Sequence, residues 1–200
     1  MNKIFYEELL NGWCPRVSND EALICVFEKV RDIPYGSTGE RNPENIVTEN
    51  LGSCSGKHIL LSNVFRTLGF ETRILTCLHF FNEALPFGND YPEPLNELLQ
   101  NHHIIDFHHF IKIKKGGIWL NVDATWDAHL SKFGFPINLE WRGDSDTTLA
   151  VHPIKFYPET DDVIGLKEGL IAELSPEDQV LRANFLRLLT DWFKEIRSED

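Results

Sequence analysis

A short segment rich in glycine and serine places a cysteine where a helix is expected to begin. It reads Gly52-Ser53-Cys54-Ser55-Gly56-Lys57-His58 and opens an amphipathic stretch that ends at Leu68-Gly69. A helix N-terminus carries roughly +0.5 elementary charge and unpaired N–H groups, so it favours a thiolate over a thiol. The segment therefore predicts a reactive cysteine on a helix of about residues 54–68. The alternative is a buried cysteine that behaves as a small apolar side chain.

Composition limits the classes of protein that this chain can belong to. A length of 200 residues predicts one domain, residues 1–200, with a core of about 20–130 and a C-terminal helical extension of about 160–197. The net charge of −12 argues against nucleic acid or an anionic membrane surface as the main partner. We expect a substrate partner instead, a peptide, a protein or a small amide, and the composition does not specify an oligomeric state.

The cysteines and the first residues bear on the cellular compartment. Cys14, Cys25, Cys54 and Cys77 lack CxxC spacing, and two of them lie in apolar runs. This pattern predicts free thiols in a reducing compartment rather than a disulfide framework. Residues 1–8 turn acidic too early for a signal peptide, and no apolar run reaches membrane-spanning length. We therefore expect a cytoplasmic protein.

Periodicity predicts an α+β fold of helices packed on an antiparallel sheet. Ser18 and Glu21 form a capping-box pattern ahead of a helix, and residues 36–50 are expected to form a loop. Strands are expected over 71–81, 104–114, 118–122 and 149–157, with Gly116-Gly117 joining the middle pair as a hairpin. A short helix is expected at 94–100, and the amphipathic helix that follows Ser175 ends the chain.

A base and an acid suited to thiol catalysis follow the cysteine. His108 and Asp123 lie on the two strands of the expected hairpin, at nearly equal distances from Gly116-Gly117. Cross-strand neighbours have Cβ atoms about 4.5–5.5 Å apart, close enough for a carboxylate to fix an imidazole tautomer. If the helix start packs against this edge, Cys54, His108 and Asp123 form a catalytic triad.

At these residues the chain resembles the transglutaminase-like superfamily, whose core has a papain-like architecture. The resemblance covers about residues 20–130. It begins at Val30-Arg31-Asp32-Ile33-Pro34-Tyr35, continues through the Cys54 segment and Leu68–Arg73, and closes with His108 through Trp119 to Asp127. The order and spacing of these motifs together carry the likeness. The chain departs from the family pattern at His109 and Phe110, and it shows no calcium loop of the animal enzymes.

The resemblance implies a role for each residue of the triad. Cys54 is the nucleophile, His108 the general base and acid, and Asp123 the orienting carboxylate. The implied activity is hydrolysis or acyl transfer at amide, isopeptide or ester bonds, through an acyl-thioester and without a cofactor or a metal. Trp126 is expected in the core or at the rim of a substrate cleft, and Ser53 and Ser55 beside the nucleophile complete the expected substrate site. The backbone N–H of Cys54 supplies one oxyanion donor, and the sequence does not place a second.

Two other functions stay open at this stage. Cys54, His58 and His108 have the chemistry of zinc ligands with Asp123, and strand alternation would align His102, Asp106 and His108 on one face. The other alternative is an inactive transglutaminase-like protein that binds a partner through its C-terminal helix or acidic face. In the catalytic-triad hypothesis, the alternation of side chains between the two faces of a strand allows only one of His108 and His109 to face the thiol. The spacing selects His108, since His109 shares a face with apolar Ile111 and Ile113.

Overall fold

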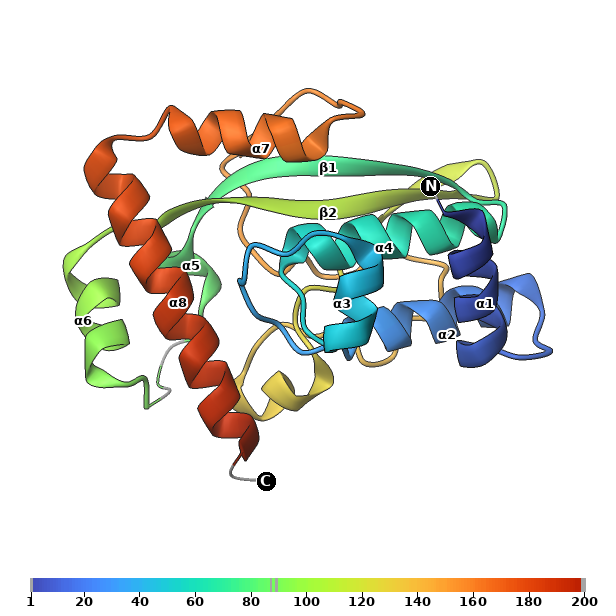
Figure 1. Ribbon diagram of the computed structural model, residues 1–200, viewed down its shortest axis with the longest axis horizontal. Coiled ribbons are helices and arrows are strands. Elements are labelled where there is room, and N and C mark those ends of the chain that lie inside the picture. The colour runs from blue at the N-terminus through green and yellow to red at the C-terminus, as the bar shows by residue number, and fades with distance from the viewer. Residues whose placement is uncertain (1, 87, 89, 199–200) are drawn as a thin grey trace.

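The structure is a computed structural model that describes residues 2–86, 88 and 90–198, and Figure 1 shows its arrangement. A curled antiparallel sheet of four strands, ordered β3-β2-β1-β4, is covered by helices. In the view of Figure 1 the long β1–β2 ribbon has α4 on one side and α7 on the other, and α8 crosses one end. The α+β class expected from the sequence is confirmed.

Four helices precede the sheet: α1 (Lys3–Trp13), α2 (Asn19–Arg31), α3 (Pro43–Glu49) and α4 (Cys54–Thr67). The capping box of α2 is confirmed, because Ser18 and Glu21 exchange side-chain and backbone hydrogen bonds. Helix α1 was not predicted from the sequence, and α3 lies inside the segment expected as a loop. Asn42 caps α3 through its side chain, with Pro43 at the first helical position, and this start signal is readable in the sequence.

The sheet closely follows the predicted strands. β1 spans Glu71–Phe80, β2 Ile105–Lys115 and β3 Ile118–Val122, and Gly116 and Gly117 form the hairpin turn with positive φ angles. The pairing of Ile111 with Val122 sets the hairpin register. The last strand is shorter than expected: β4 spans only Lys155–Phe156 and pairs with the β1 edge.

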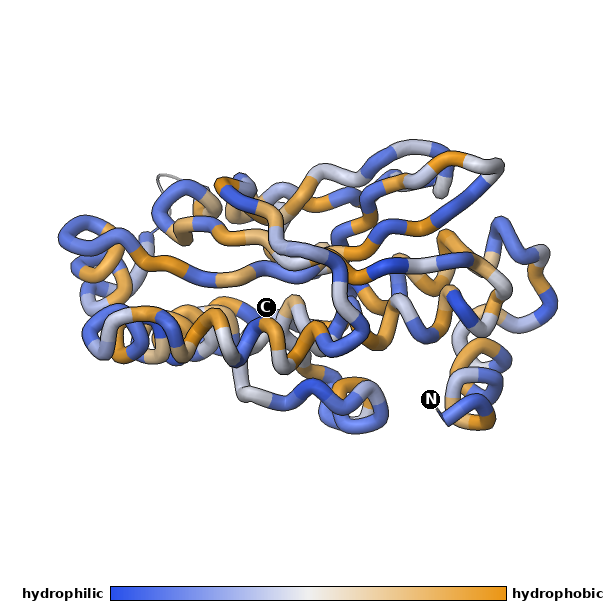
Figure 2. Tube along the Cα trace, turned by 90° about the horizontal axis from the view of Figure 1, so that it is seen from above, coloured by the Kyte–Doolittle hydropathy of each residue, from blue (hydrophilic) through white to orange (hydrophobic). Residues whose placement is uncertain are grey.

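Short helices connect these elements, and two longer helices end the chain. Between β1 and β2 lie α5 (Phe81–Ala84) and α6 (Glu93–Asn101), and the 3-10 helix η1 (Ala128–Phe133) follows β3. The C-terminal pair comprises α7 (Val163–Ala172) and α8 (Pro176–Ser198). Figure 2 shows hydrophobic and hydrophilic residues alternating along the helices, as expected for elements with one buried face.

Two clusters of apolar side chains form the core. One cluster joins α1, α2 and α4 to the β2–β3 face that carries Ile111 and Ile113. The other contains Cys54, Cys77 and Phe110 and packs against α8, which buries Phe185, Leu189 and Phe193 among others. Cys54 lies in this second cluster, so α8 forms part of the structure around the cysteine. The expected single domain over 1–200 remains a prediction.

The disulfide prediction is wrong. Cys14 and Cys25 form a disulfide, with their Cα atoms 6.1 Å apart and a sequence separation of 11. The bond joins the end of α1 to the middle of α2, because these helices pack together after a short turn. Among the described residues, no helix is both long enough and apolar enough to cross a membrane.

Candidate active site

A backbone bridge and close helix packing position Cys54. Tyr35 and Gly52 form an isolated parallel bridge, which holds the segment before α4 against the residues that follow α2. Ser53 is the N-cap of α4 and Cys54 is its first residue, as predicted. Gly56 allows α3 to approach α4, because a Cβ atom there would lie 2.8 Å from Ile46 Cδ1. Gly56 thus allows the close helix approach that holds the start of α4 in place.

His108 and Asp123 contact each other as the hairpin predicted. His108 Nε2 donates to Oδ2 of Asp123 over 2.8 Å, and both side chains are buried. The register places the pair diagonally rather than directly opposite, since Ile111 faces Val122. His108 also lowers the pKa of the Cys54 thiol, and Cys54 in turn raises the pKa of His108. Because Asp123 occupies Nε2, Nδ1 is the ring nitrogen left for the sulfur.

The Asp123 carboxylate is held by the backbone around it. Oδ2 also accepts from the N–H of Ala150 over 2.8 Å, and Oδ1 accepts from the N–H of Thr125 over 3.0 Å. Burial opposes the charge on Asp123, but His108 and these hydrogen bonds hold its pKa well below the usual range. The carboxylate therefore stays ionised and keeps His108 in one orientation.

The charges around Cys54 and His108 favour the ionised form of each side chain. Burial raises the pKa of Cys54, but the ammonium of Lys167 and the hydrogen bond and charge of His108 lower it to about 6. Burial lowers the pKa of His108, while Asp123 and Cys54 together raise it to about 10. At neutral pH the site thus holds a thiolate beside an imidazolium. By contrast, burial raises the pKa of the other free thiol, Cys77, to about 12.

His58 has a structural task that the sequence analysis missed. Its Nε2 accepts from the N–H of Ala124 over 2.9 Å, so its Nδ1 carries the proton and donates to the Cys54 carbonyl over 2.8 Å. Burial lowers the pKa of His58 to about 4, which keeps it neutral. Both ring nitrogens are therefore occupied, and His58 has no free lone pair for zinc.

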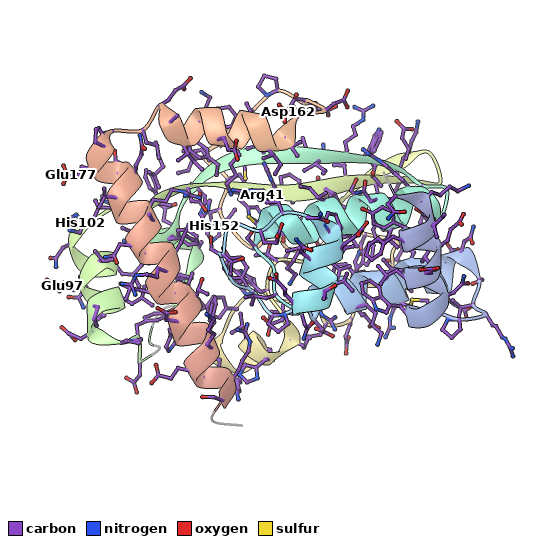
Figure 3. All side chains as sticks on the ribbon, viewed as in Figure 1. Arg41, Glu97, His102, His152, Asp162 and Glu177 are labelled. Atoms are coloured by element: carbon purple, nitrogen blue, oxygen red, sulfur yellow. A yellow bond between two sulfur atoms is a disulfide. The ribbon has the colours of Figure 1, made fainter. Side chains whose placement is uncertain are left out.

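The other residues proposed as metal ligands are also separated. His102 caps the end of α6 and precedes β2, so it does not share a strand face with Asp106 and His108; Figure 3 shows it at the outer end of α6. Among the described residues, no group of three or more histidine, cysteine, aspartate or glutamate side chains has the arrangement of a metal site. The geometry favours a thiolate site over the zinc alternative.

A second charged group beside Cys54 was not found from the sequence. Lys167 of α7 places Nζ 3.8 Å from Cys54 Sγ and 3.9 Å from Asp106 Oδ1. Asp106 also accepts from Arg182 Nε of α8 over 2.6 Å. The signal for Lys167 is its spacing: it lies four residues after Val163 and three before Leu170, on the apolar side of its helix. A lysine on that face is unusual.

Tyr35 is a second missed residue. Its ring packs against Trp126 at 4.8 Å and against Phe193 at 5.9 Å between centroids. Burial, with the charges of Cys54 and Asp106, raises the pKa of the Tyr35 phenol well above 10. The hydroxyl therefore keeps its proton at neutral pH. Its motif is Ile33-Pro34-Tyr35, whose place is set by the bridge to Gly52.

The three residues expected to bind substrate occupy different positions. Ser55 is buried with Oγ 4.0 Å from Cys54 Sγ, and Ser53 is the partly exposed N-cap. Trp126 lies in the core, where its Nε1 donates to the Ala150 carbonyl and its ring contacts Phe135 and Phe193. The indole does not line an open cleft in this structure, because α8 covers it.

His109 and His79 surround the site without joining the triad. His109 faces away from His108 along β2, as alternation predicted, and both of its buried ring nitrogens lack a hydrogen-bond partner among the described residues. Burial lowers the pKa of His109 well below 6.5, and burial lowers that of His79 to about 3. Both rings are neutral packing groups at neutral pH.

The reacting groups are covered. Cys54 is 4% exposed, His108 2% and Asp123 4%, and α7 lies directly over the sulfur through Lys167. All three side chains are therefore almost fully shielded from solvent in this conformation.

Comparisons with known proteins find likeness to solved structures and not to a family model or a curated protein. No family model matches the chain, and no curated protein matches it. Among solved structures, the chain is similar to one from Cytophaga hutchinsonii, named as a putative cysteine protease, at 19% identity and a TM-score of 0.43. The match covers 62% of this chain and 37% of the other, so this chain spans well under half of that protein.

Proposed function

We propose that this protein is a cysteine-dependent acyl-transfer enzyme, a hydrolase or an acyltransferase, acting on amide, isopeptide or ester bonds. The observation that carries the proposal is the buried hydrogen bond between His108 and the Asp123 carboxylate, in a cluster where His108 also lowers the pKa of the Cys54 thiol. Burying three ionised groups is costly, and stability alone seldom explains such an arrangement. Perturbed titration in a buried cluster is typical of a catalytic site.

The first step is attack on the carbonyl carbon of the substrate. The Cys54 thiolate forms the C–S bond, and the carbonyl electron pair moves to oxygen. The N–H of Cys54 at the start of α4 and the hydroxyl of Tyr35 stabilise that oxyanion. The hydroxyl stays protonated because burial and the neighbouring negative charges raise its pKa.

The second step breaks the bond to the leaving group. The His108 imidazolium donates its proton from Nδ1 to the departing amine or alkoxide, which leaves an acyl-thioester on Cys54. His108, now neutral, then takes a proton from water or from an acceptor amine, which attacks the thioester and releases the thiolate. Asp123 holds the ring in the same orientation throughout. Water as acceptor makes a hydrolase, and an amine makes an acyltransferase.

The test is acylation of the thiol followed by site-resolved mass spectrometry. The full chain is treated with 4-nitrophenyl acetate, with and without an added alkylamine. We expect an acetyl group on Cys54 that is lost to water or amine, normal behaviour in Cys77→Ala, and no acetylation or turnover in Cys54→Ala. Because α7 covers the sulfur, the same assay includes Val163→Asp, which weakens the docking of α7. Absence of acetyl-Cys54 in both the wild type and Val163→Asp would refute the proposal.

A further inference from the structure

Helix α7 docks onto the site in an unusual manner. Its buried residues are Val163 and Lys167, while its other apolar residues are partly exposed. Figure 3 labels Asp162, whose side chain caps the start of this helix through the N–H of Gly165. A lysine is among the side chains least often buried, unless it is paired. The contact of α7 with the rest of the protein is therefore centred on a cation.

The pocket that receives this cation is built beside the nucleophile. Lys167 Nζ is nearly equidistant from Cys54 Sγ, at 3.8 Å, and Asp106 Oδ1, at 3.9 Å. Asp106 precedes His108 by two residues on β2, so both side chains belong to one face of the strand. The second cation on Asp106, Arg182, comes from α8. Asp106 thus lies two residues before His108 on the same face of β2. The Lys167 ammonium contacts both the Asp106 carboxylate and the Cys54 sulfur.

The charges in this cluster balance only while Lys167 is present. The negative groups are Cys54, Asp106 and Asp123, and the positive groups are His108, Arg182 and Lys167. If Lys167 leaves, Cys54 and Asp106 lose the cation that contacts both of them, and buried charges require a partner. A group that takes the place of Lys167 is therefore expected to be cationic.

The two C-terminal helices differ in how firmly they are held. Helix α8 buries seven residues, six of them apolar or aromatic and several in the Cys54 cluster, whereas α7 buries two. Residues 158–162 before α7 are exposed, and so are its last residue, Ala172, and the following Glu173. Elements with little buried apolar surface open at low free-energy cost. Of the elements over Cys54, α7 is the one able to leave while α8 and Arg182 stay in place.

We infer that Asp106 is a specificity-determining residue that selects a primary ammonium group beside the reacting carbonyl, and that Lys167 of α7 occupies this subsite in the closed protein. The substrate half of this inference rests on the proposed function, whereas the cation subsite exists with or without turnover. In the closed state α7 acts as a lid that carries its own substitute for the substrate cation. A substrate with a lysine side chain or a free amino terminus near its acyl group competes with Lys167.

The subsite is tested with three methanethiosulfonate reagents of different charge on the full chain. The Cys54 thiolate attacks the reagent's sulfenyl sulfur, a mixed disulfide forms, and methanesulfinate leaves, so no oxidant is needed and no catalysis is assumed. The reagents carry an ethylammonium, a methyl or an ethylsulfonate group. Rates at Cys54 are measured by mass spectrometry in the wild type, in Lys167→Met and in the matched control Lys167→Arg. N-acetylcysteine gives the intrinsic rate ratio of the reagents.

We expect slow modification of Cys54 by all three reagents in the wild type and in Lys167→Arg. In Lys167→Met the ethylammonium reagent should react at least tenfold faster than the sulfonate, after division by the N-acetylcysteine ratio. Comparing reagents within one variant cancels any change in the thiolate fraction. In Asp106→Asn/Lys167→Met, which removes both charges of the pair, the preference should disappear. Thermal unfolding by circular dichroism establishes that each variant is folded.

Two results would overturn the inference. One is a Lys167→Met variant whose normalised rates do not depend on reagent charge, and the other is a preference that persists when Asp106 is also replaced. Val163→Asp provides a second route if Lys167→Met does not fold, because it loosens α7 and keeps the lysine. We then expect Cys54 to react faster with all three reagents. Unchanged rates in Val163→Asp would contradict the role of α7 as a lid. Failure of the proposed function can be told apart from failure of this inference. It would leave the rates of modification by the methanethiosulfonate reagents unchanged and would abolish only the release of the acetyl group from Cys54.

Discussion

His108 donates through Nε2 to Asp123 across the β2–β3 hairpin, and this 2.8 Å contact decides which ring nitrogen faces Cys54. The same carboxylate oxygen also accepts from the N–H of Ala150, and its other oxygen accepts from Thr125. Hydrogen bonds to the Asp123 carboxylate therefore connect the β2–β3 hairpin, the turn that follows it and the loop at 147–150. Its two tasks, orienting the base and holding the loops, are separable by substitution.

Asp123→Asn should lower kcat by about 10³–10⁴, because an amide can stabilise the wrong imidazole tautomer. The amide nitrogen also replaces one of the two oxygens that together accept from three donors, so we expect a stability loss of about 1–3 kcal/mol from unpaired buried groups. Turnover of 4-nitrophenyl acetate and urea unfolding measure the two effects. Asp146→Asn is the control, since Asp146 is exposed and bonds Asn121. Unchanged turnover in Asp123→Asn would move the orienting role to another residue.

Alkylation of Cys54 by iodoacetamide should rise as pH increases through about 6, because the thiolate is the reactive form and Lys167 and His108 hold its pKa there. Above pH 10 the partner imidazolium loses its proton. In His108→Ala the rise should move to higher pH. Site-resolved mass spectrometry follows Cys54 against Cys77, whose pKa of about 12 keeps it unreactive near neutrality. Faster labelling of Cys77 than Cys54 at pH 7 would contradict the assignment of the nucleophile.

His109→Leu should make the protein less sensitive to acid without removing activity. Burial holds the pKa of His109 well below 6.5, so the unfolded chain takes up a proton below pH 6.5 that the folded chain does not. Stability is therefore present above pH 6.5 and is lost as pH falls, at about 1.4 kcal/mol per pH unit for one histidine. Urea unfolding from pH 6.5 to 5 should show a slope smaller by about that amount. His152→Leu, a substitution at an exposed position, is the matched control.

Much of the fold and the contact of His108 with Asp123 could be predicted because they depend on local patterns. Ser18 with Glu21, Gly116 with Gly117 and the stripe of α4 each act within a few residues. The hairpin register then brings His108 to Asp123 with no long-range information. Cys54 joins them through the bridge between Tyr35 and Gly52, which spans a loop that periodicity does not describe.

What the sequence analysis missed depends on distant contacts. Lys167 reaches Cys54 across 113 positions, and Arg182 reaches Asp106 across 76. The disulfide between Cys14 and Cys25 required knowledge that α1 exists and packs on α2. Trp126 looked suited to a cleft because its turn follows Asp123, but Phe193 of α8 covers it. In each case the contact that was not predicted involves a helix near one end of the chain, α1, α7 or α8, and not the contact between His108 and Asp123.

Removing the disulfide should destabilise the protein by about 3 kcal/mol, from the entropy of closing a loop of this length. The double variant Cys14→Ala/Cys25→Ala tests this by urea unfolding. Reductant should lower the stability of the wild type to a similar extent and should not affect the double variant, which is the internal control. Alkylation before and after reduction measures the pairing directly. Labelling of Cys14 and Cys25 without reductant, in protein purified in air, would contradict the bond.

Tyr35→Phe separates stabilisation of the oxyanion from reactivity of the thiol. The substitution removes only the hydroxyl and keeps the ring packing against Trp126 and Phe193. Loss of one oxyanion donor costs about 10²–10³ in kcat, so acyl transfer should fall by that factor with little change in KM. Alkylation of Cys54 by iodoacetamide forms no oxyanion and should therefore keep its rate. Tyr157→Phe, at the residue that follows β4, should alter neither reaction. A parallel fall in both reactions of Tyr35→Phe would mean that Tyr35 acts on the thiolate and not on the oxyanion.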